Sequence, residues 1–172
     1  MKIIHETAII YSNVIIEDNV YIGPYCIIGA PPEWKGREKD SQGVYIAEGT
    51  RITGLVTIDS GANGVTYIGR DCYIMKKVHI GHDAIIGKGV TMSSHSIVGG
   101  HTTIGDYTNL GLGCIIHQKL NIPMGCMIGM GGIVTKKSEL KPFGIYVGNP
   151  VRYLSDNLRA INEHKEDYGR CL

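Results

Sequence analysis

An apolar residue recurs at every sixth position over most of the chain. Isoleucine occupies positions 4, 10, 16, 22 and 28, and the same step continues at positions 46, 52 and 58. The pattern restarts out of phase at Ile68, and every sixth residue from there to Leu140 is apolar. Glycine often follows these positions, and a small residue often lies two before them. Side chains two apart on a strand point the same way, so each hexad predicts a short strand with two inward residues and a tight turn.

Three such hexads make one triangular coil of 18 residues. Stacked coils form a parallel β-helix, in which each strand pairs with the strands above and below it. The pattern therefore predicts an all-β fold, a parallel β-helix of hexapeptide repeats over residues 1–153.

Two segments interrupt the repeat. Residues 30–44 are polar, charged and rich in proline, which predicts a long external loop, and residues 59–66 predict a smaller bulge. Insertions in repeat arrays often lie on the binding face. Beyond the repeat, residues 154–172 predict a short helical tail.

Composition narrows the function classes. A net charge of +1 over 172 residues gives no electrostatic reason to expect a nucleic-acid partner. The chain has no apolar run of membrane-spanning length and no signal peptide at its start, so we expect a cytoplasmic protein without a membrane span. Four of the five cysteines occupy the small inward position, so we expect them to fill the core: Cys26, Cys72, Cys114 and Cys126.

Several histidines fall on one predicted edge. Positions 80, 98 and 116 lie 18 residues apart, so the turns that follow them should stack about 4.8 Å from one another. His79 should point outward just before that edge. The stacked turns carry, in order, His82 and Asp83, then Gly100 and His101, then His117 and Gln118.

Three interpretations of this edge are open. The residues could be ordinary solvated turn positions. His79 and His82 have a spacing seen in metal sites, but no cysteine or carboxylate set completes a coordination sphere, so we expect no metal. The favoured interpretation is general-base catalysis, because histidine titrates near neutral pH and Asp83 could fix its tautomer. Gly100 could offer a bare N–H to a developing oxyanion.

Residues 75–118 resemble the UDP-N-acetylglucosamine O-acyltransferase family, which begins lipid A synthesis. The segments "HIGHD", "GGH" and "HQ" fall in register with that family's "HIAHD", "AGH" and "HQ". The resemblance implies coils that wind left-handed and a homotrimer with active sites between subunits. It also implies transfer of a 3-hydroxyacyl group from acyl carrier protein to a sugar hydroxyl.

The same resemblance assigns roles. It implies that His82 is the general base, that Asp83 is its partner and that Gly100 supplies the oxyanion N–H. The residues expected to position sugar and acyl groups are His79, His101, His117 and Gln118.

Three more residues outside that edge are candidates for substrate binding. "PPEWK" resembles the family's "NQDLK", which makes Glu33 and Lys35 candidate substrate contacts, with an ordinary charged loop as the alternative. The resemblance also implies that Met130 lies at the end of the acyl groove and limits the acyl chain to a short one, with core filling as the alternative.

The C-terminal region departs from that family. The chain ends about where the family's helical domain would begin, and "YVGNPVRYL" instead resembles the last coil of coenzyme A-dependent sugar acetyltransferases. Arg152 could contact a donor phosphate there, or be a surface residue. The donor is therefore an acyl carrier protein or coenzyme A thioester, and no bound cofactor is expected.

The expected function is transfer of an acyl group, a short 3-hydroxyacyl group, from a thioester to a hydroxyl of a UDP-amino sugar. The alternative is an acetyl- or acyl-CoA-dependent N-acyltransferase that acts on a nucleotide-linked amino sugar. Rivals from other classes are a binding or assembly protein, and a metal-dependent hydratase of the carbonic anhydrase type.

Overall fold

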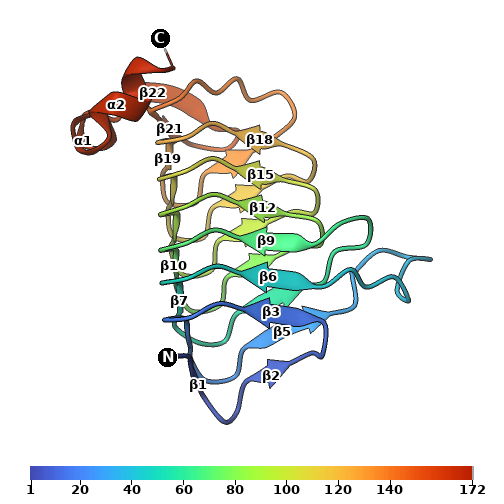
Figure 1. The fold of residues 1–172 in the computed structure, drawn as a ribbon. Helices are drawn as coiled ribbons and strands as arrows, with labels where there is room; N and C mark the ends of the chain where they lie inside the picture. The colour runs from blue at the N-terminus through green and yellow to red at the C-terminus, as the bar shows by residue number, and fades with distance from the viewer. Residues whose placement is uncertain (172) are drawn as a thin grey trace.

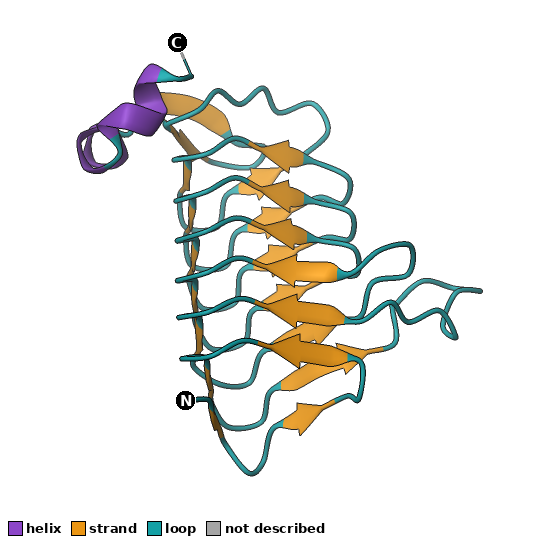
Figure 2. Ribbon diagram, viewed as in Figure 1, coloured by secondary structure: helices purple, strands orange, loops and turns teal. Residues whose placement is uncertain are grey.

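Short strands stack into three sheets that form the walls of a triangular prism (Figures 1 and 2), in a computed structural model that describes residues 1–171. The first sheet contains β1 (Ile3–Ile4), β4 (Tyr21–Ile22), β7 (Arg51–Ile52), β10 (Tyr73–Ile74), β13 (Thr91–Met92), β16 (Asn109–Leu110), β19 (Met127–Ile128), β21 (Gly144–Val147) and β22 (Arg152–Asp156). The second contains β2 (Ile9–Ile10), β5 (Ile27–Ala30), β8 (Thr57–Asp59), β11 (His79–Ile80), β14 (Ile97–Val98), β17 (Ile115–Ile116) and β20 (Ile133–Val134). The third contains β3 (Val14–Ile16), β6 (Val44–Ile46), β9 (Thr66–Ile68), β12 (Ile85–Ile86), β15 (Thr103–Ile104) and β18 (Asn121–Ile122). The predicted parallel β-helix is confirmed.

The register between coils follows the repeat. Ile80 of β11 pairs with Ile58 of β8 on one side and with Val98 of β14 on the other. The repeated position and the small residue two before it both point into the prism, as Ile80 and Val78 do. Each coil therefore adds the same apolar layer to one continuous core, which burial of that surface stabilises.

The four cysteines at small inward positions are buried, as predicted. Burial raises the pKa of the Cys114 thiol to about 12, which keeps it protonated and unreactive at neutral pH. At the N-terminal end of the prism, β1 pairs with β4, and Ile3 and Ile4 of β1 are exposed.

Both interruptions of the repeat leave the prism at the same edge. The loop 31–43 connects β5 to β6, and the segment 60–65 connects β8 to β9, so each runs from the second sheet to the third. They project from one side of the prism in Figure 1. The turns after β11, β14 and β17 continue that edge, and we call residues 81–83, 99–101 and 117–119 the histidine edge.

The chain ends in a hairpin and two short helices. β22 pairs antiparallel with β21 and runs across residue 153, the expected end of the β-helix. Helices α1 (Leu158–Glu163) and α2 (Lys165–Gly169) follow, while Leu172 lies outside the described residues. Asn157 caps α1 by accepting the N–H of Ala160, and it also donates to the Gly125 carbonyl, which fixes the tail to the prism. Within residues 1–171, no helix has the length and apolar character needed to cross a membrane.

Candidate active site

The histidine edge forms because parallel pairing holds successive turns in register. His79 pairs with Thr57 below and Ile97 above, so the residues that follow these strands lie over one another. Asp83 and His101 occupy equivalent turn positions and both adopt left-handed backbone conformations, with φ of 58° and 57°. Residues at equivalent positions on other edges share this conformation, so it belongs to the coil turn rather than to the site.

His82 and Asp83 form a nearly buried pair. Nδ1 of His82 lies 2.7 Å from Oδ2 of Asp83, and His82 is 9% exposed. Because the carboxylate accepts a hydrogen bond, it favours the tautomer with the proton on Nδ1 and leaves Nε2 as a base. A Cβ added to Gly100 would lie 2.7 Å from this Nε2, so only glycine leaves room for the ring. No acceptor among residues 1–171 takes the Gly100 N–H, which leaves it available to a ligand.

Three backbone N–H groups of the segment 60–65 hold the Asp83 carboxylate. Ala62 donates to Oδ2 at 3.0 Å, and Asn63 and Gly64 donate to Oδ1 at 2.7 and 2.8 Å. Burial alone would raise the pKa of Asp83, but the hydrogen bonds from His82 and from these three N–H groups outweigh it and lower the pKa to about 2. The bulge expected from the sequence is thus the cradle of the Asp83 carboxylate.

The long loop covers the histidine pair with an aromatic ring. Trp34 stacks on His82 at 5.3 Å between ring centroids and 25° between planes, and it meets His101 edge to face at 5.4 Å. His82 and His101 themselves meet edge to face at 4.9 Å. Trp34 was not among the predicted site residues, although it is the only tryptophan and lies between Glu33 and Lys35. That position was the signal that could have found it.

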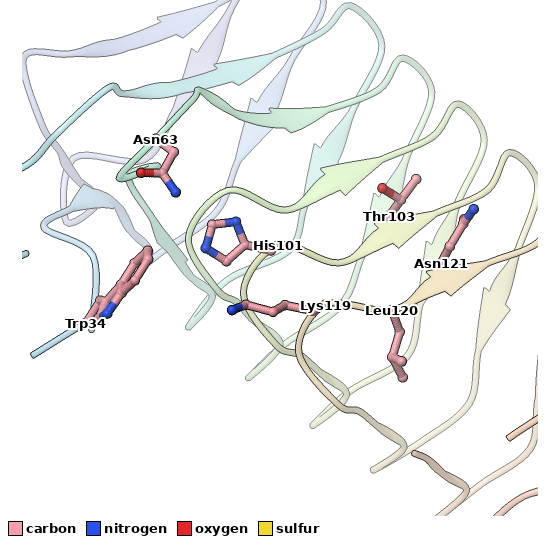
Figure 3. A pocket seen from close by; sticks show the side chains of 7 residues that line it. All are labelled: Trp34, Asn63, His101, Thr103, Lys119, Leu120 and Asn121. Carbon is pink, nitrogen blue, oxygen red and sulfur yellow. The ribbon is translucent and has the colours of Figure 1, made fainter. Parts of the chain in front are cut away.

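Two hollows adjoin this aromatic cluster. One, of about 240 Å³, is lined by Glu33, Trp34, Lys35, His82, His101, Gln118 and Lys119. The other, of about 530 Å³, is lined by Trp34, Asn63, His101, Thr103, Lys119, Leu120 and Asn121 (Figure 3). Trp34, His101 and Lys119 line both, so they separate the two spaces. Burial lowers the pKa of His101, while the nearby Asp83 raises it, and its Nε2 lies 3.7 Å from Asp83 Oδ2 without a hydrogen-bond partner among the described residues.

A second aspartate lies beside His79 and was not predicted. Nδ1 of His79 lies 2.8 Å from Oγ1 of Thr57, and its Nε2 lies 3.8 Å from Oδ2 of Asp59. Asp59 is only 5% exposed, and within residues 1–171 its Oδ2 has no hydrogen-bond partner. Burial raises the pKa of Asp59, while the neighbouring His79 lowers it and Glu33 raises it. In the sequence Asp59 occupies a position where the repeat usually has glycine, which was the available signal.

Other predicted residues fall around this centre. Glu33, Lys35 and Gln118 line the smaller hollow. His117 is exposed on the histidine edge, and its Nδ1 lies 2.9 Å from the Gln118 carbonyl oxygen.

Two predicted residues do not join the site within one chain. Met130 lies in the turn between β19 and β20, at the edge between the first and second sheets. It is 75% exposed, so the alternative of core filling is wrong. Arg152 is exposed in β22, at the C-terminal end of the prism, several coils from His82.

Three groups at the centre could approach one cation. The ligand atoms of His82, Asp83 and His101 lie within 4.8 Å of one another. A cation on Asp83 Oδ2 would, however, displace the hydrogen bond from His82, and both carboxylate oxygens already accept backbone N–H groups. The donors are therefore arranged for a hydrogen-bonded pair.

Known proteins resemble this chain in sequence and in structure. The family model "Bacterial transferase hexapeptide (six repeats)" matches residues 66–100. The Acyl-[acyl-carrier-protein]–UDP-N-acetylglucosamine O-acyltransferase of Thermodesulfovibrio yellowstonii is 40% identical over 74 residues, which are 43% of this chain and 22% of that protein. The match thus spans less than a quarter of that relative's length.

Solved structures extend the likeness to nearly the whole chain. The UDP-N-acetylglucosamine acyltransferase of Bacteroides fragilis superposes with a TM-score of 0.89 at 26% identity, over 94% of this chain and 64% of that one. The enzyme of Campylobacter jejuni gives 0.78 at 26% identity, over 98% of this chain and 79% of that one. A perosamine N-acetyltransferase from Caulobacter crescentus shares the fold, with a TM-score of 0.57 at 18% identity over 91% of this chain and 57% of that one.

Together, the six-residue repeat and the superpositions show that the chain has the fold of a left-handed parallel β-helix. Within that class, the chain resembles the UDP-N-acetylglucosamine O-acyltransferases in particular.

Proposed function

We propose that this chain is an acyltransferase that moves an acyl group from a thioester donor to a hydroxyl of a UDP-amino sugar. The observation that carries the proposal is the His82–Asp83 pair, whose free Nε2 faces the bare backbone of Gly100. The similarity to UDP-N-acetylglucosamine O-acyltransferases supports the substrate class.

His82 acts as the general base in this proposal. Its Nε2 takes the proton of the acceptor hydroxyl while the oxygen attacks the thioester carbonyl carbon. The developing imidazolium is stabilised by Asp83, which stays ionised because its pKa is about 2. The oxyanion of the tetrahedral intermediate accepts the N–H of Gly100. The C–S bond then breaks, and the thiolate leaves with the proton that His82 returns.

The surrounding residues position the two substrates. His101, Gln118, Glu33 and Lys35 line the hollow beside His82, which suits contacts with the sugar and its diphosphate. His79 and His117 flank it on the same edge. Lys35 and Lys119 supply positive charge for phosphate groups.

An apolar stripe suits the acyl chain. Ile97 and Ile115 on the outer face of the second sheet and Leu112 at its edge are all exposed, and they lead from the histidine edge toward Met130. We propose that the acyl chain follows this stripe and that Met130 limits it to a short 3-hydroxyacyl group. A homotrimer would cover the stripe and complete the site between subunits.

The donor and its contacts belong to the same proposal. The acyl group arrives on acyl carrier protein or coenzyme A, with Arg152 as a contact for a donor phosphate and no bound cofactor. A cytoplasmic location is part of the proposal, because nucleotide sugars and these thioesters are made there.

N-acylation of a nucleotide-linked amino sugar is the second candidate. Asp59 favours it, because its buried oxygen Oδ2, which has no hydrogen-bond partner among residues 1–171, suits an amine donor near His79. Incubation with UDP-linked sugars and amino sugars, in parallel with 3-hydroxyacyl carrier proteins and acyl-CoAs, followed by mass spectrometry, separates the two. A hydroxyacyl ester supports the first candidate and an amide the second. No product, together with stoichiometric zinc in the purified protein, would favour a metal-dependent hydratase instead.

A further inference from the structure

Arg37 of the long loop reaches back to the cradle that holds Asp83. Its Nη2 donates to the Ala62 carbonyl at 3.3 Å and to Oδ1 of Asn63 at 3.0 Å. Its Nε pairs with Asp40 of the same loop, which fixes the guanidinium from the other side. The loop 31–43 is thereby attached to the segment 60–65 through one side chain.

A single peptide group separates Arg37 from Asp83. The Ala62 carbonyl that accepts from Arg37 and the Asn63 N–H that donates to Asp83 Oδ1 at 2.7 Å belong to the same amide plane. A cation at the oxygen end and a carboxylate at the nitrogen end both align with the amide dipole. Hydrogen bonds in such a chain polarise one another, so the Arg37 contact strengthens the N–H donated to Asp83.

The cradle itself is tightly folded around that amide. A Cβ at Gly61 would lie 1.5 Å from the Gly64 carbonyl oxygen, so the segment closes on itself only with glycine there. This closure is what lets three successive N–H groups, those of Ala62, Asn63 and Gly64, converge on one carboxylate.

Arg37 also contacts the aromatic ring that stacks on His82. Its guanidinium carbon lies 4.9 Å from the Trp34 ring centroid, and Trp34 stacks on His82. The contacts therefore close a ring from Arg37 through the cradle to Asp83 and His82, and back through Trp34. The Arg37 side chain therefore restrains His82 in two ways, through the Asp83 carboxylate and through the Trp34 ring.

We propose that Arg37 is a positioning residue for the His82–Asp83 pair, acting through the Ala62–Asn63 peptide group and through Trp34. The effect of Arg37 on catalysis rests on the proposed acyl transfer. Its effect on structure, a polarised Asn63 amide, is independent of that proposed function.

The first test compares Arg37→Met with Arg51→Met in acyl-transfer assays. Arg51 is a matched control, since it lies over the Tyr21 ring in the first sheet, away from the histidine edge. We expect Arg37→Met to lower kcat about tenfold, the size expected for one charge-assisted hydrogen bond. The acceptor KM should change little, because Arg37 lines neither hollow. Equal losses in both variants, or an unchanged kcat in Arg37→Met, would overturn the proposal.

Chemical rescue separates positioning from a general loss of structure. Millimolar guanidinium should restore turnover of Arg37→Ala in a saturable way and leave Arg51→Ala unaffected. Arg37→Lys keeps the charge but loses the planar fork, so we expect intermediate turnover. If Arg37→Ala and Arg37→Met both fail to fold, Arg37→Lys decides, and full activity in that variant contradicts a need for the fork.

The second test needs no activity. The amide proton of Asn63, bonded at 2.7 Å to a carboxylate, should resonate well downfield in the NMR spectrum, and Arg37→Met should move it upfield. An unmoved Asn63 amide overturns the proposed link. An inactive wild-type protein with a moved amide would instead reject the proposed acyl transfer and leave the link intact.

Discussion

His82 and Gly100 occupy the same turn position on successive coils, and the ring of one covers the backbone of the other. A Cβ on Gly100 would lie 2.7 Å from Nε2 and 2.8 Å from Cε1 of His82. The missing side chain therefore creates the space in which, in the proposed mechanism, an acceptor hydroxyl, the His82 base and the Gly100 N–H meet.

Gly100→Ala should damage activity far more than stability. The added methyl displaces the His82 ring from Asp83, so we expect kcat to fall by at least about a hundredfold, as when a general base is misplaced. The control, Gly113→Ala, has nothing within 4 Å of its added Cβ but has φ of 63°, so it reports a backbone strain that Gly100, without a positive φ, does not have. A Gly100→Ala enzyme as active as Gly113→Ala would contradict the close approach.

Asp83→Asn should change both catalysis and the pH dependence of stability. The pKa of Asp83 is about 2 in the folded protein against an ordinary value of 3.8, so its contribution is complete above about pH 4 and is lost as pH falls toward 2. That shift corresponds to about 2 kcal/mol. Urea unfolding of both proteins at pH 7 and pH 2.5 should show a difference in stability that shrinks at the lower pH. A difference independent of pH would contradict the charged cradle.

Asp59→Asn should stabilise the protein and weaken acceptor binding. Burial raises the pKa of Asp59, so its ionised form costs folding free energy at neutral pH, and the amide removes that cost. The gain should diminish as the pH falls and the carboxyl of the parent protein becomes protonated. We expect KM for the acceptor to rise while the melting temperature stays equal or increases. Asp18→Asn, a change at an exposed carboxylate, is the control, and an unchanged KM would remove Asp59 from the acceptor site.

Met130→Gly should lengthen the preferred acyl chain. Met130 is largely exposed at the edge to which the apolar stripe leads, so its removal opens space at that end. Competition among 3-hydroxyacyl donors of increasing length, read by product mass, measures the preference. An unchanged preference would show that Met130 lies outside the acyl path.

The sequence predicted which turns form the candidate site better than it predicted the conformations of the loops that surround it. The six-residue step determines which turns stack, so the sequence alone predicts that His82, Asp83, Gly100 and His101 lie together. The same counting could have shown that residues 31–43 and 60–65 leave from that edge too, because Ile28, Ile58 and Ile80 share one column.

What the step could not predict is how the inserted segments fold back. Loop conformation determines the stacking of Trp34 on His82 and the three N–H hydrogen bonds to Asp83. The sequence of a loop has no repeating pattern from which that conformation could be predicted. The electrostatic environment of Asp59 has the same origin, because the long loop brings Glu33 close enough to influence the pKa of its carboxyl group. The edge occupied by Met130 follows from the repeat, whereas its relation to the acyl chain is part of the proposed homotrimer.

The most direct test of the account is the turnover of His82→Ala beside that of His95→Ala, in the acyl-transfer assay that gives product with the parent protein. His95 is exposed in the turn between the first and second sheets and serves as the matched control. The account predicts a loss of at least about a hundredfold in kcat for His82→Ala, parental activity for His95→Ala, and melting temperatures close to the parent for both. Parental turnover in a folded His82→Ala protein would contradict the central claim.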